Sequence, residues 1–448
     1  MSDDNHESIR IESVIIEVRE DRPVAEIANG ISDIDIFEHL DKPYLTAMLA
    51  YTDRDSIIAD MDISGGEKVH ITLKSNRTQD TVSVSKTFFI DKIVISDKST
   101  EITELYVFHL IEDIGYVSNL HNVNTSYSGK PSDIISKISN QYFPDKSINQ
   151  VSQDFQSMKV IVPNLTPIDA MCWIKNRAST KDGYPFYLYS TLVGSDLQLR
   201  DLNSLMTASS LNAERTFTFS ESELSKSENP PTTTERIIVR YQSKGTENLF
   251  KLIQEGLVGS EYRYVDVTKN KRVEFSFNID EEVIKSFRSH NIIDKGTPLF
   301  DNGRYKEITG DIKSRRISQI GSSSAYQNHK SNSESEEVPQ TIKSYSESEE
   351  VAQYKLNIIN RAMSHMLTKS KIDIVLEGVQ FLDGEENMTV GRKISLRFLR
   401  NRMNENDAEI FDTKKSGDFL IFACKHSISR DSYYVTMSGV KLSNGEVQ

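Results

Sequence analysis

The chain has 448 residues, of which 37% are hydrophobic and 27% are charged, and its formal net charge is −13 at pH 7. A chain of this length is too long to fold around one ordinary hydrophobic core, and it is predicted to form two to four soluble domains. The negative charge disfavours sequence-independent binding of nucleic acid, which requires a basic face. A negatively charged surface would still let DNA pass without binding it. No apolar run approaches the roughly eighteen residues of a membrane-spanning helix, and the acidic start is unlike a signal peptide, so we expect assembly in the cytoplasm and no membrane insertion.

The sequence contains two cysteines, Cys172 and Cys424, and both lie inside apolar runs. Two isolated cysteines supply neither a disulfide framework nor the ligand spacing of a zinc site. We interpret both as small buried hydrophobic residues.

A similar pattern of strands occurs near both ends of the chain. Each copy consists of a turn glycine, an alternating strand, a loop, a second strand, a polar hairpin and a third strand. The copies are residues 66–74, 87–96 and 105–112 in the first case, and residues 391–399, 417–429 and 433–438 in the second. Alternation with a period of two is typical of half-buried strands. The pattern predicts a mainly β protein with two duplicated antiparallel, tail-tube-like β-barrels.

Residues 1–113 are predicted to form the first barrel. Ile9, Ile11, Val14 and Ile16 begin a strand with rough alternation. Residues 56–63 are predicted to be a strand that leads into the Ser64-Gly65-Gly66 turn, and residues 44–51 could be another strand entering the barrel.

Residues 114–205 are predicted to form an α+β insertion domain. A helix is expected over residues 130–140, with Ser132 or Asp133 as its cap. A second helix is expected to start at Thr166 as N-cap, with Pro167 at the first helical position. Residues 185–190 and 197–200 should then form a hairpin.

The rest of the chain is predicted to alternate between barrel and insertion. Residues 206–245 would begin the second barrel, and residues 246–350 a second insertion, with a helix near residues 249–257 and a hairpin of 261–267 with 272–277 that is closed by Lys269-Asn270. Its end, residues 321–350, repeats Ser-Glu-Ser-Glu-Glu-Val and is interpreted as an acidic solvated loop or an interaction arm. Residues 351–448 would supply a helix to Thr368 and the remainder of the second barrel.

The sequence contains only weak matches to metal-binding, phosphate-binding and catalytic motifs. Asp60 could open a calcium-binding loop, but Ile71 stands where the bidentate acid should be. Ser128-Gly129-Lys130 lacks the earlier glycine of a phosphate loop. Nine histidines are scattered, and those in strands, His70, His109 and His426, are expected to be satisfied or exposed. We therefore expect no catalytic, cofactor-binding or metal residues, no cofactor and no enzymatic activity.

Aromatic residues in the first insertion have two interpretations. Residues 184–189, Tyr-Pro-Phe-Tyr-Leu-Tyr, could bind a ligand, or they could form a strand with two buried faces, which is the favoured interpretation. Trp173, the one tryptophan, lies in the expected helix and is assigned to packing.

The order of several stretches resembles the baseplate hub family of contractile-tailed phages, which is related to the hub region of type VI secretion spike proteins and to phage late control proteins. The first stretch is Pro163-Asn-Leu-Thr-Pro-Ile-Asp-Ala-Met-Cys-Trp-Ile, followed by the aromatic run and Leu197-Gln-Leu-Arg-Asp-Leu. The second is Thr246-Glu-Asn-Leu-Phe-Lys-Leu-Ile-Gln-Glu-Gly-Leu. The third, residues 376–396, has a small turn, then valine and glycine, then a strand.

The resemblance implies a structural hub subunit of the virion baseplate. It implies a homotrimer whose two barrels per subunit give a pseudo-six-fold ring, with neighbouring subunits pairing strand edges. The expected partners are the tail tube protein and a central spike on a separate chain, since no spike domain follows the second barrel, and also the tape measure and baseplate wedge proteins. DNA would cross the lumen without specific binding. The alternatives are a tail-associated cell-wall or polysaccharide hydrolase, or a carbohydrate-binding β-protein that exposes the 184–189 aromatics.

Overall fold

The computed structural model describes most of the chain, and β-strands predominate in it. The described residues are 9–18, 24–75, 83–100, 103–155, 157–211, 217–219, 237–244, 249–266, 271–293, 297–298, 315–321, 347–367, 370–378, 389–398, 412–430 and 432–444. Within these residues, no helix is both long and apolar enough to cross a bilayer.

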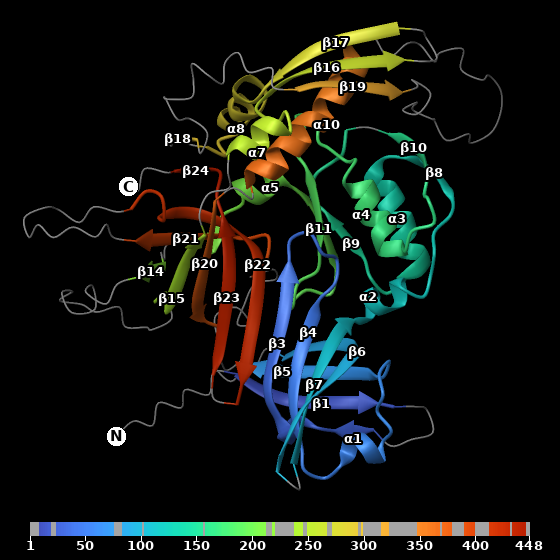
Figure 1. Ribbon diagram of the computed structural model, residues 1–448, viewed down its shortest axis with the longest axis vertical. Coiled ribbons are helices and arrows are strands. Elements are labelled where there is room, and N and C mark those ends of the chain that lie inside the picture. Colours follow the sequence, from blue (N-terminus) through green and yellow to red (C-terminus); the bar gives the residue numbers. More distant parts are fainter. Residues whose placement is uncertain are drawn as a thin grey trace, which may run out of the picture.

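One 14-stranded sheet joins the two ends of the chain (Figure 1). Its main path runs β15-β20-β23-β22-β3-β4-β7-β6-β5-β1-β2, so the last strands of the sequence pair with the first ones. The prediction of closed barrels is not confirmed, because the described strands form an open sheet. In the middle of this path, the edge of β22 pairs with β3 of the N-terminal unit. That edge is therefore not available to close a barrel within the C-terminal unit.

The N-terminal unit supplies half of this sheet. Its strands are β1 (Ile9–Glu17), β2 (Ala25–Glu26), β3 (Ile31–His39), β4 (Thr46–Asp53), β5 (Lys68–Ser75), β6 (Ser83–Thr100) and β7 (Thr103–Glu112). In Figure 1, β1 and β5 run across β3 and β4, so the unit folds over itself around a core. Alternate residues of β5, namely Val69, Ile71 and Leu73, are buried in that core, as their period of two predicts.

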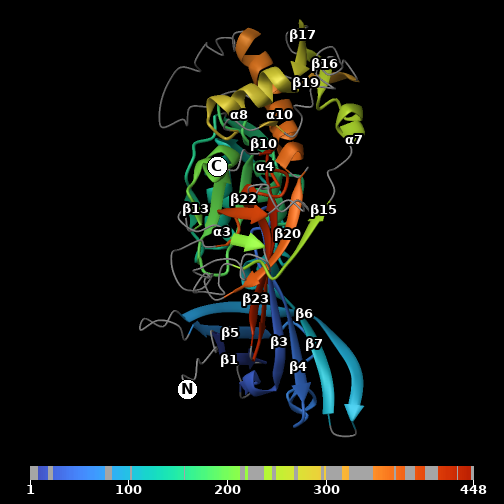
Figure 2. The same cartoon turned by 90° about the vertical axis from the view of Figure 1, so that its left-hand side faces the viewer.

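The C-terminal unit supplies the other half. Its strands are β13 (Ser210–Leu211), β14 (Phe217–Phe219), β15 (Arg240–Lys244), β20 (Lys371–Glu377), β21 (Lys393–Phe398), β22 (Gly417–Ser429) and β23 (Tyr433–Val440). The path β15-β20-β23-β22 is antiparallel throughout. Figure 2 shows the strands of both units following one another along the molecule.

The first insertion has a hydrophobic core of its own, built around Ile134, Ile138, Met171 and Ile174. Its elements are α2 (Asp113–Ser118), β8 (Ser126–Gly129), α3 (Pro131–Tyr142), β9 (Ile148–Gln150), β10 (Met158–Ile161), α4 (Pro167–Lys175), β11 (Phe186–Tyr189), β12 (Leu197–Asp201) and α5 (Leu202–Thr207).

The two helix starts in this insertion had different outcomes. Thr166 caps α4 as predicted, because its side chain accepts the N–H of Asp169 at 3.2 Å. The predicted cap of α3 was wrong. The helix begins at Pro131, and Ser132 instead donates its hydroxyl to Asp154 at 2.7 Å.

The second insertion covers the far end of the molecule in Figure 1. It contains α7 (Leu249–Gln254), β16 (Gly259–Asp266), β17 (Lys271–Asn278), the helical turns η3 (Asp280–Ile284) and α8 (Lys285–Ser289), and β19 (Arg315–Gly321). The short strands β18 (Thr297–Pro298) and β24 (Ser443–Asn444) pair with each other. The long helix α10 (Glu347–Leu367) then leads back to the sheet. The Lys269-Asn270 turn and most of the acidic repeat lie outside the described residues.

The strand predicted over residues 56–63 was wrong. A short helix, α1 (Ile57–Asp60), occupies this segment. The Asp53 carboxylate accepts the N–H groups of Asp55, Ile57 and Ile58 at 3.0 to 3.2 Å, which caps a helical turn that the apolar pattern does not reveal.

Candidate assembly interface

The same order of five strands occurs in both units. In the N-terminal unit the order is β5-β6-β7-β4-β3, and in the C-terminal unit it is β21-β22-β23-β20-β15. The registers match as well. Val69 pairs with Phe88 where Ile394 pairs with Phe419, and both phenylalanines are buried. The repeated pattern in the sequence therefore corresponds to a repeated strand order in space.

A turn glycine begins each repeat with the same backbone contacts. Gly66 and Gly391 have φ of +88° and +86°, a region that favours glycine. The Gly66 N–H donates to the Ile90 carbonyl at 2.8 Å, and the Gly391 N–H donates to the Ile421 carbonyl at 3.0 Å. A β-bulge then follows each isoleucine in turn, at Asp91 and at Phe422.

The two units meet at the seam, which we define as the pairing of β3 with β22. The seam is antiparallel and runs from Ala423 opposite His39 to Ser429 opposite Asp33. On the outer face, the Asp35 carboxylate binds Lys425 Nζ at 3.0 Å and the Ser427 hydroxyl at 2.6 Å. Both partners of this ion pair are partly exposed, so its contribution is modest and the backbone ladder carries most of the contact.

The inner face of the seam contains a buried polar chain. His426 Nε2 lies 3.3 Å from Glu38 Oε1, and His426 Nδ1 lies 2.8 Å from the Tyr433 hydroxyl. Burial by itself would raise the pKa of Glu38, but the hydrogen bond and charge of His426, together with Thr389 and the Leu192 N–H, lower the pKa below its ordinary value. The carboxylate is therefore held in its charged form at the centre of the seam.

Glu38 also holds two further segments against the seam. Its carboxylate accepts the backbone N–H of Leu192, from the loop after β11, and that of Val390 at 3.4 Å, next to the turn glycine of the second repeat. One buried side chain thus connects the N-terminal unit, the first insertion and the C-terminal unit. A buried charge that is satisfied in this way fixes a unique arrangement, because each partner would be costly to leave unpaired.

Cys424 completes a group of three potential metal ligands with Glu38 and His426, all within 4.8 Å of one another and all buried. Cys424 Sγ lies 3.4 Å from His426 Nε2. Burial, and secondarily the Glu38 charge, raises the pKa of this thiol well above its ordinary value, whereas a metal ligand or nucleophile must be a thiolate. Glu38 and His426 already have hydrogen-bond partners, so this group fits a structural anchor better than a metal centre.

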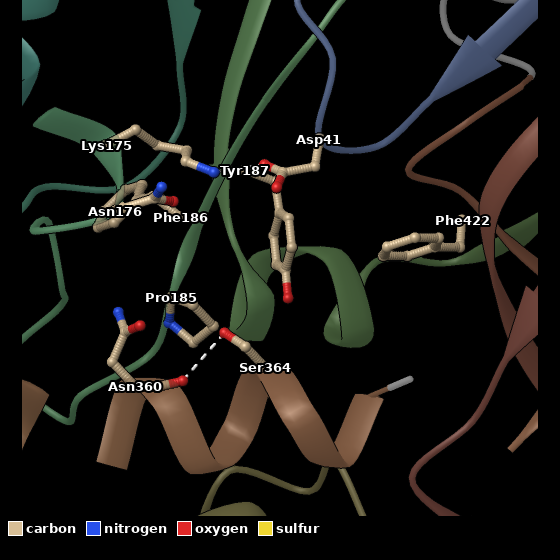
Figure 3. Close-up of a pocket in the computed structure, with 9 residues that line it drawn as sticks. All are labelled: Asp41, Lys175, Asn176, Pro185, Phe186, Tyr187, Asn360, Ser364 and Phe422. Atoms are coloured by element: carbon tan, nitrogen blue, oxygen red, sulfur yellow. Dashed lines mark hydrogen bonds and ion pairs between the residues drawn. The ribbon is translucent and has the colours of Figure 1, made fainter. Parts of the chain in front are cut away.

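A cavity of about 190 Å³ lies beside the seam, between the first insertion and α10 (Figure 3). Lys175 is almost fully buried there and forms an ion pair with Asp41. Figure 3 shows the Tyr187 hydroxyl directed towards Ser364, and burial raises the pKa of Tyr187. The lysine is already paired, and among the described residues no nucleophile with an adjacent base lines the cavity. The cavity therefore fits a gap in the packing between the seam, the first insertion and α10 better than an active site.

The aromatic residues of the 184–189 run are buried, and β11 is buried on both faces, as the favoured interpretation predicted. Tyr184, Phe186, Tyr187 and Tyr189 are each at most 6% exposed. An exposed aromatic platform for carbohydrate is therefore contradicted at these positions. The Tyr189 hydroxyl reaches towards Gly391, so β11 contacts the C-terminal unit at its turn glycine.

Two edges of the 14-stranded sheet, one on β6 and one on β15, have no pairing strand among the described residues and stand at equivalent places in the two repeats. The second half of β6, beyond its contact with residues 66–67, pairs only with β7. The strand β15 pairs only with β20 and lies at one end of the sheet path. These two edges are the counterparts of β22 and β3, the edges that the seam joins.

The structure is similar to solved phage tail proteins. A tail protein from Neisseria meningitidis MC58 aligns over 98% of this chain and 98% of its own length, with a TM-score of 0.51 and 10% identity. A 43 kDa tail protein of prophage MuSo2 from Shewanella oneidensis aligns over 96% and 98%, with a TM-score of 0.49 and 10% identity. The E. coli c3393 protein, a component of the type VI secretion system, aligns over 97% and 77%, with a TM-score of 0.41 and 10% identity.

The alignment with the Neisseria meningitidis protein defines the class of fold. The first alignment shows that this chain has the fold of a phage tail protein, which confirms at the level of fold the resemblance seen in the sequence. No protein-family model matches the sequence, and no curated protein matches it.

The structure brings together only some of the residues that the sequence singled out. His426 and Cys424 meet in the seam, whereas His70 and His109 lie on β5 and β7. The two cysteines are free, with Cys424 buried and Cys172 half-buried. Glu38 was missed, because one acid in an alternating strand carries no signal. The spacing of Cys424 and His426, two residues apart on one strand face, is the local clue that could have indicated a buried polar cluster.

Proposed function

We propose that this chain is a structural subunit of a contractile-tail baseplate hub. Three copies would form a ring in which six similar modules surround a channel, joining the six-fold tail tube to a three-fold central spike. The repeated strand order carries this proposal, because one chain with two equivalent modules can meet six-fold and three-fold partners at once. The duplicated modules would act as barrel-like units only within the ring, where neighbouring copies continue the sheet.

The seam supports the ring geometry. It already places two modules edge to edge inside one chain, with a ladder of backbone hydrogen bonds and a buried Glu38–His426 pair. A ring repeats such a contact until it closes. In a closed ring, the unpartnered edges of β6 and β15 would be paired with strands of neighbouring copies.

The remaining parts of the proposal follow from the resemblance. Residues 114–205 and 246–350 would be insertions on the outside of the ring, and residues 1–113, 206–245 and 351–448 would form its wall. The partners would be a separate spike chain, the tube protein, and the tape measure and wedge proteins, in a virion tail assembled in the host cytoplasm. A net charge of −13 suits a lumen through which DNA passes without binding.

The function is proposed to be non-catalytic. A solved structure that shares this fold is a tail protein. His426 and Cys424 are buried and engaged in the seam. We expect that no single substitution of a histidine, serine or cysteine abolishes a hydrolytic activity. A peptidoglycan or polysaccharide hydrolysis assay on the purified protein would contradict the proposal if it detected an activity that one such change removed.

The mass in solution tests the ring directly. Light scattering over a range of concentrations should give three times the subunit mass of 50.9 kDa for the protein alone, or that mass plus the mass of the spike after mixing with a three-fold spike protein. Electron microscopy of that species should show a ring with a central opening. A protein that stays monomeric with both spike and tube proteins would overturn the proposal.

A further inference from the structure

We infer that the contact between copies is a second seam, in which the second half of β6 in one copy pairs antiparallel with β15 of the next copy, in the register of the internal seam. This inference rests on the proposed ring and specifies the strands and residues that would close it. The partner is a second copy of this chain, because each copy offers both halves of the contact. The path would then continue from β6 of one copy into β15 of the next without a free edge.

The register follows from matching the two repeats residue by residue. Val94 pairs with Val107 on β7, and Lys425 pairs with Thr436 on β23, so Val94 is the counterpart of Lys425. Two residues further on, Ser96 is the counterpart of Ser427.

The same comparison applies to the other edge. Asp35 pairs with Met48, and Gln242 pairs with Asp373, so Gln242 is the counterpart of Asp35. Lys244, two residues further on, is the counterpart of Phe37. Because Lys425 lies opposite Phe37 in the internal seam and Ser427 opposite Asp35, the second seam places Val94 opposite Lys244 and Ser96 opposite Gln242.

The side chains at these positions are compatible with such a contact. In the internal seam a lysine lies opposite an apolar residue, and Lys425 Nζ is 6.0 Å from the Phe37 ring. The second seam repeats this combination with the roles exchanged, since Lys244 would lie opposite Val94. Val94 is 36% exposed in the single chain, and Lys244 is exposed with an aliphatic stem that can cover it. The charged Asp35–Lys425 pair has no counterpart here, so association should depend little on salt.

Paired cysteines test the register. The double variant Val94→Cys with Lys244→Cys, in a Cys172→Ser background, places two thiols directly opposite each other, about 5 Å apart between Cβ atoms. Mild oxidation of the full-length protein should give disulfide-linked dimers and trimers on a denaturing gel. The matched control, Val94→Cys with Gln242→Cys, is off register by two residues and should give several-fold less product, and each single-cysteine variant should give none.

Two measurements on the unmodified protein separate this inference from the proposed ring. Light scattering gives its mass, and hydrogen exchange reports whether those amides of residues 94–96 and 242–244 that point away from β7 and β20 are protected in the trimer. A trimer in which these amides exchange freely, or in which the off-register pair forms the disulfide better, would overturn the second seam and leave the ring standing. A monomer that forms no disulfide, with or without the spike and tube proteins, would overturn both.

Discussion

Glu38 Oε1 lies 3.3 Å from His426 Nε2, and this buried contact joins β3 of the N-terminal unit to β22 of the C-terminal unit. It is a direct polar link between two segments at opposite ends of the sequence. Both side chains are fully buried, so the contact is shielded from solvent and salt. The stability of the seam should depend on it.

Removing the Glu38 carboxylate should destabilise the protein strongly. Glu38→Ala leaves His426 and the N–H groups of Leu192 and Val390 without their acceptor. Breaking a buried pair by deleting one partner costs about 3–5 kcal/mol. Denaturant unfolding followed by circular dichroism should show this loss. The matched control is Asp35→Ala, which removes the partly exposed ion pair of the same seam and should cost less than about 1 kcal/mol. Equal losses from the two variants would contradict the role given to Glu38.

The same carboxylate should make stability depend on acid. The folded-state pKa of Glu38 is lowered from its ordinary value of 4.5, because the effects of His426, Thr389 and Leu192 outweigh burial. A carboxyl with a depressed pKa contributes stability that is present above its unfolded value and is lost as the pH falls through the folded value. Thermal unfolding of the unaltered protein should therefore weaken more steeply below pH 4.5 than that of Glu38→Gln. Parallel pH profiles would count against this assignment.

The two turn glycines should differ in their tolerance of alanine. Both have positive φ, so each substitution carries a backbone cost. A Cβ at Gly391 would lie 2.3 Å from the Tyr189 hydroxyl oxygen, whereas a Cβ at Gly66 would meet its nearest atom, the Tyr116 hydroxyl oxygen, at 3.3 Å. Gly391→Ala should therefore lower the melting temperature more than Gly66→Ala.

A second substitution tests the cause of that difference. Tyr189→Phe removes the closest oxygen and should restore part of the stability that Gly391→Ala loses, while it should not improve Gly66→Ala. An equal effect of Tyr189→Phe on both glycine variants would show that the steric contact is not the cause.

Neither thiol should react quickly in the folded protein. Burial raises the pKa of Cys172 to about 11, and burial together with the Glu38 charge raises the pKa of Cys424 well above its ordinary value. At pH 8 both are therefore almost entirely protonated, and the thiolate is the reactive form. A chromogenic disulfide reagent should label the native protein slowly and reach two thiols per chain after denaturation. Rapid labelling of Cys424 would contradict its burial, and rapid labelling of Cys172 would contradict the raised pKa of its thiol.

Local patterns predicted most of the individual elements. Thr166 and Pro167 marked the start of α4, because a hydroxyl cap and a proline without an N–H both suit a helix start. The alternation in residues 68–73 gave the buried face of β5. The failures came where an acid accepted hydrogen bonds that the local pattern does not reveal. Asp154, from elsewhere in the chain, accepts the hydroxyl of Ser132, which had been expected to cap α3, and Asp53 accepts backbone N–H groups at the start of α1.

The sequence by itself determined the mainly β character, the repeated pattern of strands, the two-faced burial of residues 184–189 and the likeness to phage tail proteins. These features depend on period, composition and order, which are local properties of the chain. Only the tertiary structure decided that the two repeats form an open sheet joined through β3 and β22 rather than two closed barrels. Strand edges look alike in sequence, since their hydrogen bonds come from the backbone. The choice of partner therefore depends on which edges the folded units bring together and on buried contacts such as that between Glu38 and His426.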